Sequence, residues 1–272
     1  MGLRITQVDA FTNKPFAGNP AADCIMPESR DAKWMQDVAR EMNLSETAFL
    51  VRSRFAGSRN AGQSDGYNLR WFTPAVEVDL CGHATLASAH VLWEEEHLKS
   101  NEQARFHTRS GLLTADRKGE WIEMDFPAKL EEPAVEPSDL ARALGVSPKY
   151  VGKNEFDYLV EVGSEEVVRK MNPDFTLLGT LPVRGVIVTA PPSSSEYDFV
   201  SRFFGPRAGV NEDPVTGSAH CCLGPFWGKR LKKDQLVGYQ ASARGGVVRV
   251  RLGGDRVYLQ GQAVTVLRGE LV

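Results

Sequence analysis

The stretch that decides the fold is LRWFTPAVEVDLCGHATLASAH, residues 69–90, because the chain repeats it as SRFFGPRAGVNEDPVTGSAH at residues 201–220. Three positions recur at a constant offset (202 − 70 = 132), namely Arg70, Phe72 and Pro74 as Arg202, Phe204 and Pro206. The match then slips by about a residue, which sets Gly82-His83-Ala84-Thr85 against Val215-Thr216-Gly217-Ser218. Both copies continue into small residues typical of a helix. The repeat predicts two halves with the same architecture.

The sequence that follows each copy also repeats. Residues 106–126 and 239–261 both have the pattern of a strand, a glycine-containing turn and a second alternating strand. Two halves of about 130 residues match the usual size of a domain. The segment AKLEEPAVEPSD (128–139) is rich in proline and acidic residues, so it is the predicted joint. We therefore expect an N-terminal half at 1–127 and a C-terminal half at 128–272.

Each half contains one helix that is small and apolar nearly all round, near residues 83–96 and 216–230. This composition predicts a buried helix. The N-terminus of a buried helix offers unpaired N–H groups and the positive end of the helix dipole, which together favour an anion. We expect a carboxylate or a similar anion at Gly82-His83-Ala84 and at Thr216-Gly217-Ser218. The small residues also allow close packing, and this second interpretation is compatible with the first.

Composition excludes several classes of protein. The chain has 272 residues, a formal net charge of −3 and a pI near 6.0, which gives no reason to expect a nucleic-acid partner. No apolar run reaches the roughly 20 residues that span a bilayer, and the N-terminus lacks the apolar core of a signal peptide. The cysteines and histidines show no zinc-site spacing. We expect a cytoplasmic protein with no membrane segment and no metal.

A glutamate at the threshold of a predicted strand needs an explanation. Glu46, in EMNLSETAFL (41–50), precedes the apolar residues Ala48, Phe49 and Leu50. Burial of a carboxylate is unfavourable unless a partner or a function compensates for it. Partial desolvation favours the protonated form, which lets a carboxyl group both take and return a proton. The alternative is that Ser45-Glu46-Thr47 caps a helix or lies on an exposed edge.

Four segments in this order resemble the phenazine-biosynthesis isomerase (PhzF-like) family, most closely its phenazine-biosynthesis-like domain-containing proteins. They are DAFTNKPFAGNPAA (9–22), AREMNLSETAFL (39–50), the stretch at 69–90 and GVNEDPVTGSAH (209–220). The resemblance implies an α+β, diaminopimelate-epimerase-like fold. In that fold two pseudo-symmetric halves each wrap a curved mixed β-sheet around a buried central helix, and the active site lies between them. It also implies a homodimer that uses no metal or organic cofactor.

The resemblance further implies roles for individual residues. Glu46 would be the acid/base, His83 and Asp213 would assist it, and Gly82, Ala84, Thr216, Gly217 and Ser218 would bind the substrate. Proton removal beside an unsaturated acid needs one base and stabilisation of the developing charge, which this set supplies. The predicted function is a cofactor-independent isomerase that moves a proton between carbons of a small carboxylate-bearing substrate.

Two alternatives compete with this prediction. One is a non-catalytic binding or regulatory protein that retains the cleft, although such a protein has no need of an acid/base. The other is a racemase with two opposed cysteines, one opening each helix turn. Cys81 occupies the first of these positions, but the slipped match places Pro214 opposite it. We therefore expect Cys81, like Cys221-Cys222, to be a buried packing residue.

Overall fold

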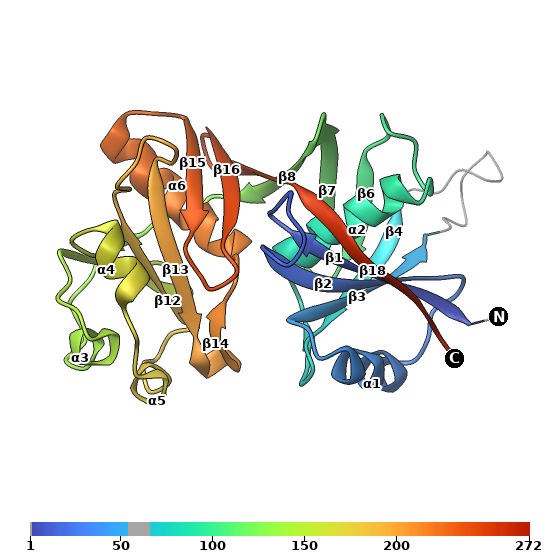
Figure 1. Ribbon diagram of the computed structural model, residues 1–272, viewed down its shortest axis with the longest axis horizontal. Coiled ribbons are helices and arrows are strands. Elements are labelled where there is room, and N and C mark those ends of the chain that lie inside the picture. The colour runs from blue at the N-terminus through green and yellow to red at the C-terminus, as the bar shows by residue number, and fades with distance from the viewer. Residues whose placement is uncertain (1, 54–65) are drawn as a thin grey trace. The chain divides into compact units, whose positions relative to one another are not determined.

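The computed structural model describes residues 2–53 and 66–272, and the chain divides into two compact units (Figure 1). The first unit comprises residues 1–125 with 260–272, and the second comprises residues 126–259. In the part of the chain that is described, no helix is long and apolar enough to cross a membrane.

The first unit is a mixed sheet with two principal helices. Its elements are β1 (Leu3–Ala10), β2 (Asn19–Met26), α1 (Ala32–Met42), β3 (Glu46–Arg52), β4 (Tyr67–Phe72), β5 (Glu77–Val78), α2 (Gly82–Glu94), β6 (Ala104–Thr108), β7 (Gly111–Lys118), β8 (Trp121–Pro127) and β18 (Ala263–Leu271).

The second unit repeats this plan with additional short helices. Its elements are β9 (Glu132–Pro133), α3 (Leu140–Leu144), β10 (Tyr150–Lys153), β11 (Asp157–Glu161), α4 (Glu165–Lys170), α5 (Phe175–Leu178), β12 (Gly185–Ala190), β13 (Phe199–Gly205), η1 (Pro206–Ala208), β14 (Val210–Asp213), α6 (Gly217–Leu231), β15 (Gln235–Gln240), β16 (Gly246–Gly253) and β17 (Arg256–Gly261).

The strand pairings of the two units have the same order and the same directions. In the first unit β1–β2 is antiparallel, β2–β3 parallel, β3–β4 antiparallel, β4–β6 parallel and β6–β7 antiparallel. In the second unit β10–β11, β11–β12, β12–β13, β13–β15 and β15–β16 follow the same sequence of directions. The predicted α+β fold with two pseudo-symmetric mixed-sheet halves is confirmed.

A duplicated ion pair fixes the correspondence between the units. Arg70 Nε donates to Glu77 Oε1 over 2.7 Å, and Arg202 Nε donates to Glu212 Oε1 over the same 2.7 Å. The two residues are 7 positions apart in the first unit and 10 in the second, where η1 lengthens the turn. Beyond this turn the offset between the copies is therefore 135 (217 − 82), the spacing of the first residues of α6 and α2.

This offset corrects the sequence alignment. The slip is three residues (135 − 132) and not about one, so the residue equivalent to Cys81 is Thr216 and not Pro214. Cys81 and Thr216 are the N-caps of α2 and α6, and Gly82 and Gly217 are the first residues of these two helices. The argument against a two-cysteine racemase still holds, because threonine cannot supply the second thiol.

The central helices are buried as the small-residue pattern predicts. Every residue of α2 from His83 to Ala89 is buried, and the helix contacts β1, β2, β3 and β18. α1 covers the opposite face of the sheet, where Met35, Val38 and Ala39 pack against Cys24 and Phe49. Alternation along β2 separates the two faces. Asn19, Ala21 and Asp23 therefore face α2.

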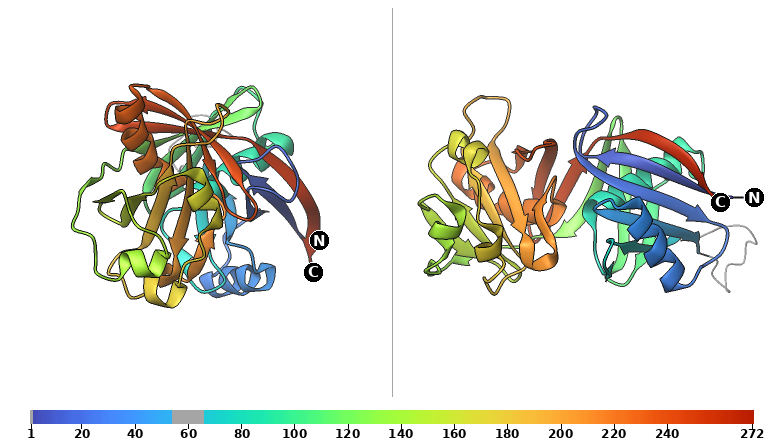
Figure 2. Two further views of the ribbon diagram at one scale, coloured as in Figure 1. Left: turned by 60° about the vertical axis from the view of Figure 1, so that its left-hand side comes forward. Right: turned by 60° about the horizontal axis from the view of Figure 1, so that its bottom comes forward.

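The last strand departs from the predicted division at 127/128. β18 pairs with β1 from Leu3↔Leu271 to Ala10↔Ala263, so residues 263–271 belong to the first unit (Figure 2). The repeat gave no indication of this pairing, because an alternating strand pattern does not specify a partner.

Candidate active site

The first unit brings Asn19, Glu46 and His83 together at one end of its sheet. Asn19 is the first residue of β2 and Glu46 the first residue of β3, and the parallel register pairs Ala21 with Glu46. His83 is the second residue of α2. The two strand starts and the helix start therefore converge. The Glu46 side chain retains 17% exposure and that of His83 only 6%.

The His83 imidazole is contacted at both ring nitrogens. Nε2 lies 3.1 Å from Glu46 Oε2, and among the described residues neither atom has a partner with hydrogen-bond alignment. Nδ1 lies 3.2 Å from Asn19 Nδ2 and 3.5 Å from Cys81 Sγ. The amide of Asn19 can turn either its oxygen or its NH₂ group toward Nδ1, and this orientation follows the protonation state of the ring.

The surroundings of His83 favour its charged form. Burial alone would lower its pKa, but negative charge at Cys81 and Glu46 outweighs this effect and raises the pKa of His83 well above 6.5. The carboxylate of Glu46 is the partner that carries this charge, since burial raises the pKa of the Cys81 thiol to about 11. The positive end of the helix dipole by itself favours a neutral imidazole. Contact with a carboxylate at 3.1 Å overrides the dipole.

Cys81 is a buried, neutral thiol. Its pKa of about 11 follows first from burial and then from the neighbouring negative charge of Glu46. A thiol in this state is neither a good nucleophile nor a good base at neutral pH. This agrees with the packing role predicted from the sequence.

Glu46, Cys81 and His83 also deserve consideration as metal ligands. Their donor atoms lie within 4.8 Å of one another in the described chain, and carboxylate, thiolate and imidazole are all zinc ligands. However, Cys81 approaches Nδ1 of the ring and Glu46 approaches Nε2. An ion uses one ring nitrogen, so two partners on opposite nitrogens of the ring do not form a shell of ligands around one ion.

The predicted residues of the second unit surround the start of α6. Thr216 Oγ1 donates to Asp213 Oδ2 over 2.6 Å. The backbone N–H of Thr216 donates to Gln240 Oε1 over 2.9 Å. This N–H is therefore already bonded within the protein, so the N–H does not support the predicted role of Thr216 in substrate binding, which stays a prediction.

The remaining predicted anion-binding groups lie in the first turns of the two central helices. Gly217 and Ser218 open α6, and Gly82 and Ala84 lie in the first turn of α2. Helix geometry gives the N–H groups of the first turn no intrahelical acceptor. Ser218 occupies the position equivalent to His83 (83 + 135 = 218). The two helix starts thus carry different side chains for different tasks.

The position of Glu46 is not duplicated as a carboxylate in the second unit. Thr47 pairs with Phe72, and Val186 pairs with the equivalent Phe204, so the residue equivalent to Glu46 is Gly185. A Cβ atom at Gly185 would lie 2.4 Å from the Phe203 ring. The second unit has no space for a side chain there. A single carboxylate, in the first unit, is therefore available for proton transfer at this pair of positions.

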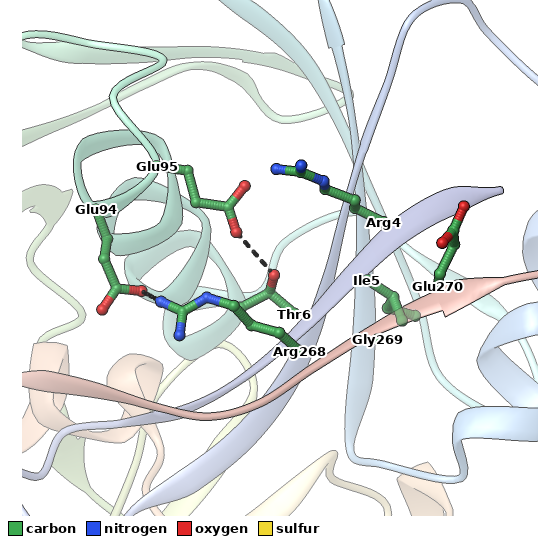
Figure 3. Close-up of a pocket in the computed structure, with 8 residues that line it drawn as sticks. All are labelled: Arg4, Ile5, Thr6, Glu94, Glu95, Arg268, Gly269 and Glu270. Carbon is green, nitrogen blue, oxygen red and sulfur yellow. Dashed lines mark hydrogen bonds and ion pairs between the residues drawn. The ribbon is translucent and has the colours of Figure 1, made fainter. Parts of the chain in front are cut away.

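A separate hollow lies at the other end of α2. It has a volume of about 610 Å³ and is lined by charged residues of β1, α2 and β18. Figure 3 shows Glu94 and Glu95 on its helix side, with Thr6 donating to Glu95 over 3.0 Å. His83 is at the start of α2 and Glu94 at its end. This hollow is therefore not part of the candidate site.

Sequence reasoning missed three polar residues, two at the helix starts and one beside the middle of α2. Asn19 contacts His83, and Gln240 contacts Thr216. Asp23 is fully buried on the α2-facing side of β2 and accepts from Ser88 Oγ over 2.6 Å. Asn19 lies in a segment that carried the family resemblance, but an amide at a strand end has no distinctive pattern. A charged residue within a buried strand was the one available indication of Asp23.

Comparison with known proteins identifies the family. The sequence model described as phenazine biosynthesis-like protein matches residues 8–269. This chain belongs to that family. It is 58% identical to an uncharacterized isomerase of Halalkalibacterium halodurans over 275 residues, with 100% of this chain and 99% of the relative covered. It is 40% identical over 289 residues to phenazine biosynthesis-like domain-containing protein 2 of Mus musculus, with coverage of 100% and 99%.

Solved structures support the same assignment. A PhzF family protein of Enterococcus faecalis superposes with a TM-score of 0.92 at 41% identity, covering 100% of both chains. A probable proline racemase of Agrobacterium radiobacter has a TM-score of 0.63 at 11% identity, covering 99% of this chain and 93% of that one. The second similarity shows the fold alone, which is the predicted epimerase-like fold. The family and its named members assign the chain to the isomerases.

Proposed function

We propose that this isomerase moves a proton between two carbons of a small carboxylate-bearing substrate, with Glu46 as the acid/base. The observation that carries the proposal is the partly buried Glu46 carboxylate placed 3.1 Å from His83 Nε2. The His83 imidazole lies beside this carboxylate, whose ionised form can accept a proton from carbon. The same side chain returns the proton to a second carbon of the bound substrate.

The other predicted residues have supporting roles in this mechanism. Ser218 and the N–H groups at Gly82, Ala84 and Gly217 would hold the substrate carboxylate, because helix starts favour anions. Asp213, with Thr216 donating to its carboxylate, would bind a cationic or hydrogen-bond-donating group of the substrate.

The alternative of a helix cap at Glu46 has less support. α1 already has its caps, because Asp31 accepts from Trp34 N at its start and Asn43 closes its end in the left-handed conformation. Glu46 begins β3 and its carboxylate faces His83. Its charge is therefore placed for a role outside the helix.

The test is solvent-deuterium exchange into a panel of small amino, hydroxy and unsaturated acids, followed by mass spectrometry. Glu46→Gln keeps the size of the side chain but cannot carry the proton. Its exchange rate should fall by roughly 10²–10⁴-fold, the usual effect of losing a general base. Glu41→Gln, an exposed neighbour on α1, is the matched control and should exchange at the wild-type rate.

Each other outcome has a defined meaning. Normal exchange by Glu46→Gln would end the assignment of Glu46 as the acid/base. No exchange of any acid by the wild-type protein, combined with tight binding of one of them, would favour the non-catalytic binding protein. The resemblance to PhzF-like proteins also leads us to propose a homodimer, which sedimentation analysis tests independently.

A further inference from the structure

Gln240, the last residue of β15, is fully buried beside the start of α6. Its Oε1 accepts from the backbone N–H of Thr216 over 2.9 Å. Its Nε2 donates to the backbone oxygen of Asp213 over 2.7 Å and to Thr216 Oγ1 over 3.2 Å. One amide thus contacts both ends of the segment 213–216, which joins β14 to α6.

These contacts fix the direction of the Thr216 hydroxyl proton. A hydroxyl group has one proton to donate. Because Thr216 Oγ1 already accepts from the Gln240 amide, its proton points away from that amide. It points to Asp213 Oδ2, which lies 2.6 Å away. Gln240 therefore acts on the Asp213 carboxylate through Thr216, without touching that carboxylate.

The segment is also held at both of its ends. Asp213 pairs with Phe203 of β13, and the Thr216 carbonyl oxygen lies 2.8 Å from His220 Nδ1. Pro214 has no N–H to donate, and its carbonyl oxygen accepts from Ser242 Oγ over 2.8 Å. On the other side of Asp213, Glu212 is held by Arg202. Within this framework, Gln240 links Asp213 to Thr216, because one side-chain amide contacts the backbone oxygen of the first and both the N–H and the hydroxyl of the second.

The first unit shows that the fold itself does not require this amide. Tyr67 pairs with Phe106, and the equivalent Phe199 (67 + 132 = 199) pairs with Gly238. The residue equivalent to Gln240 is therefore Thr108, which donates to the nearby carbonyl of Gly111 over 2.8 Å. The same strand end thus has a local turn contact in one unit and a buried amide clamp in the other.

We propose that Gln240 is a positioning residue that aims the Thr216 hydroxyl at Asp213 and holds the Asp213 carboxylate in place for the substrate. This inference rests on the proposed function, in which Asp213 binds the substrate. A residue that served only the fold would affect stability and not turnover.

Two variants test the inference in the deuterium-exchange assay. Gln240→Met keeps the length of the side chain and removes all of its hydrogen bonds. Gln240→Glu keeps an oxygen that accepts from the Thr216 N–H. Its second oxygen replaces the NH₂ group that donates to Thr216 Oγ1, so the Thr216 hydroxyl donates to this oxygen and turns its proton away from Asp213. Both variants should lower kcat/KM by roughly ten- to hundredfold, the effect of misplacing a group by up to about 1 Å.

Asn154→Leu is the matched control for the loss of a buried amide in the same unit. Asn154 Oδ1 accepts from the N–H groups of Phe156 and Asp157, each over 2.8 Å, far from the α6 start in sequence. Asn154→Leu should lower the Tm about as much as Gln240→Met and leave kcat/KM at the wild-type value.

The outcomes separate the inference from the proposed function. If the wild-type protein exchanges substrate protons and both Gln240 variants behave like the Asn154 control, the inference is wrong and the function stands. If Gln240→Glu keeps full turnover while Gln240→Met loses it, the hydroxyl-aiming step is wrong. If the wild-type protein exchanges no substrate protons, the proposed function is wrong, and the inference that depends on it is wrong as well.

Discussion

Glu46 Oε2 and His83 Nε2 lie 3.1 Å apart at the point where β3 and α2 begin. Because both side chains are largely removed from water, the Glu46 carboxylate strongly favours the charged form of His83. His83 is fully buried in an environment that favours the imidazolium. The second fully buried imidazole, His220, is in the opposite situation, since burial lowers its pKa to about 4. The two units therefore hold one charged and one neutral buried histidine at neutral pH.

The first prediction concerns the titration of His83. NMR of isotopically labelled histidine should show His83 still protonated well above pH 6.5 and His220 neutral down to about pH 4. Because the folded-state pKa of His83 is raised, its contribution to stability is fully present below pH 6.5 and is lost as the pH rises through that folded pKa. Glu46→Gln should lower the pKa of His83 and leave His220 unchanged. A His83 signal that titrates identically in the variant would contradict the pairing.

The second prediction concerns Cys81. Since burial raises the pKa of its thiol to about 11, Cys81→Ser should retain near wild-type exchange activity. Alkylation by iodoacetamide at pH 7.5 should be slow, because the thiolate is the reactive species. A loss of activity comparable with that of Glu46→Gln would instead make Cys81 a participant in the proton transfer. Thr216→Cys places a cysteine at the N-cap of α6, the position equivalent to Cys81, and its exchange activity can be compared with that of Cys81→Ser.

The third prediction concerns Asp23. Burial raises the pKa of its carboxyl group to about 8, although the hydrogen bond from Ser88 by itself lowers that pKa. Between pH 4 and pH 8 the folded state keeps a proton that the unfolded state has lost, so stability declines as the pH rises. Asp23→Asn can still accept from Ser88 but does not ionise. At pH 8 its free energy of unfolding, measured by urea denaturation, should exceed that of the wild type by at least about 1.4 kcal/mol, the equivalent of one pKa unit.

The gain from Asp23→Asn should shrink toward zero as the pH falls below 3.8, the ordinary pKa of an aspartate, because the side chain is then protonated in both the folded and the unfolded state. Ser88→Ala is the control, because it removes the hydroxyl and leaves the titrating group. A constant difference between Asp23→Asn and the wild type across the pH range would show that Asp23 does not titrate in this way.

The fourth prediction uses the duplicated ion pairs as an internal comparison. The Arg202 side chain is 11% exposed and also donates to the backbone oxygens of Val168 and Met171, whereas the Arg70 side chain is 32% exposed. Arg202→Ala should destabilise the protein by about 3 kcal/mol, as expected for breaking a buried pair. Arg70→Ala should have a smaller effect, and the exposed Arg40→Ala should change stability by roughly 0.5 kcal/mol or less. Equal losses for Arg70 and Arg202 would show that burial does not set the strength of these pairs.

The positions of the central helices could be predicted from the sequence because their composition has a physical cause. Small residues on all sides of α2 are needed for a helix that strands contact along its length. The glycines at the helix starts and the strand patterns around them completed the prediction. Glu46 was identifiable because a charged group at the edge of a buried strand is unfavourable and so calls for a reason.

The parts that could not be predicted depend on contacts between distant segments. The three-residue slip was missed because the longer turn around η1 has no counterpart in the first copy, and only the Arg202–Glu212 pair reveals where the match resumes. The role of Gln240 depends on a contact with a segment 24 residues away. A glutamine at the end of a strand is otherwise an ordinary surface residue.

The pairing of β18 with β1 has a consequence for how the chain folds as it is synthesised. Residues 126–259 leave the ribosome as one continuous segment and contain every strand of the second unit up to β17 residue Leu259. The first unit begins earlier, but its β1 stays without this neighbour until residues 263–271 emerge. The first unit therefore cannot be completed before the whole of the second unit has been synthesised.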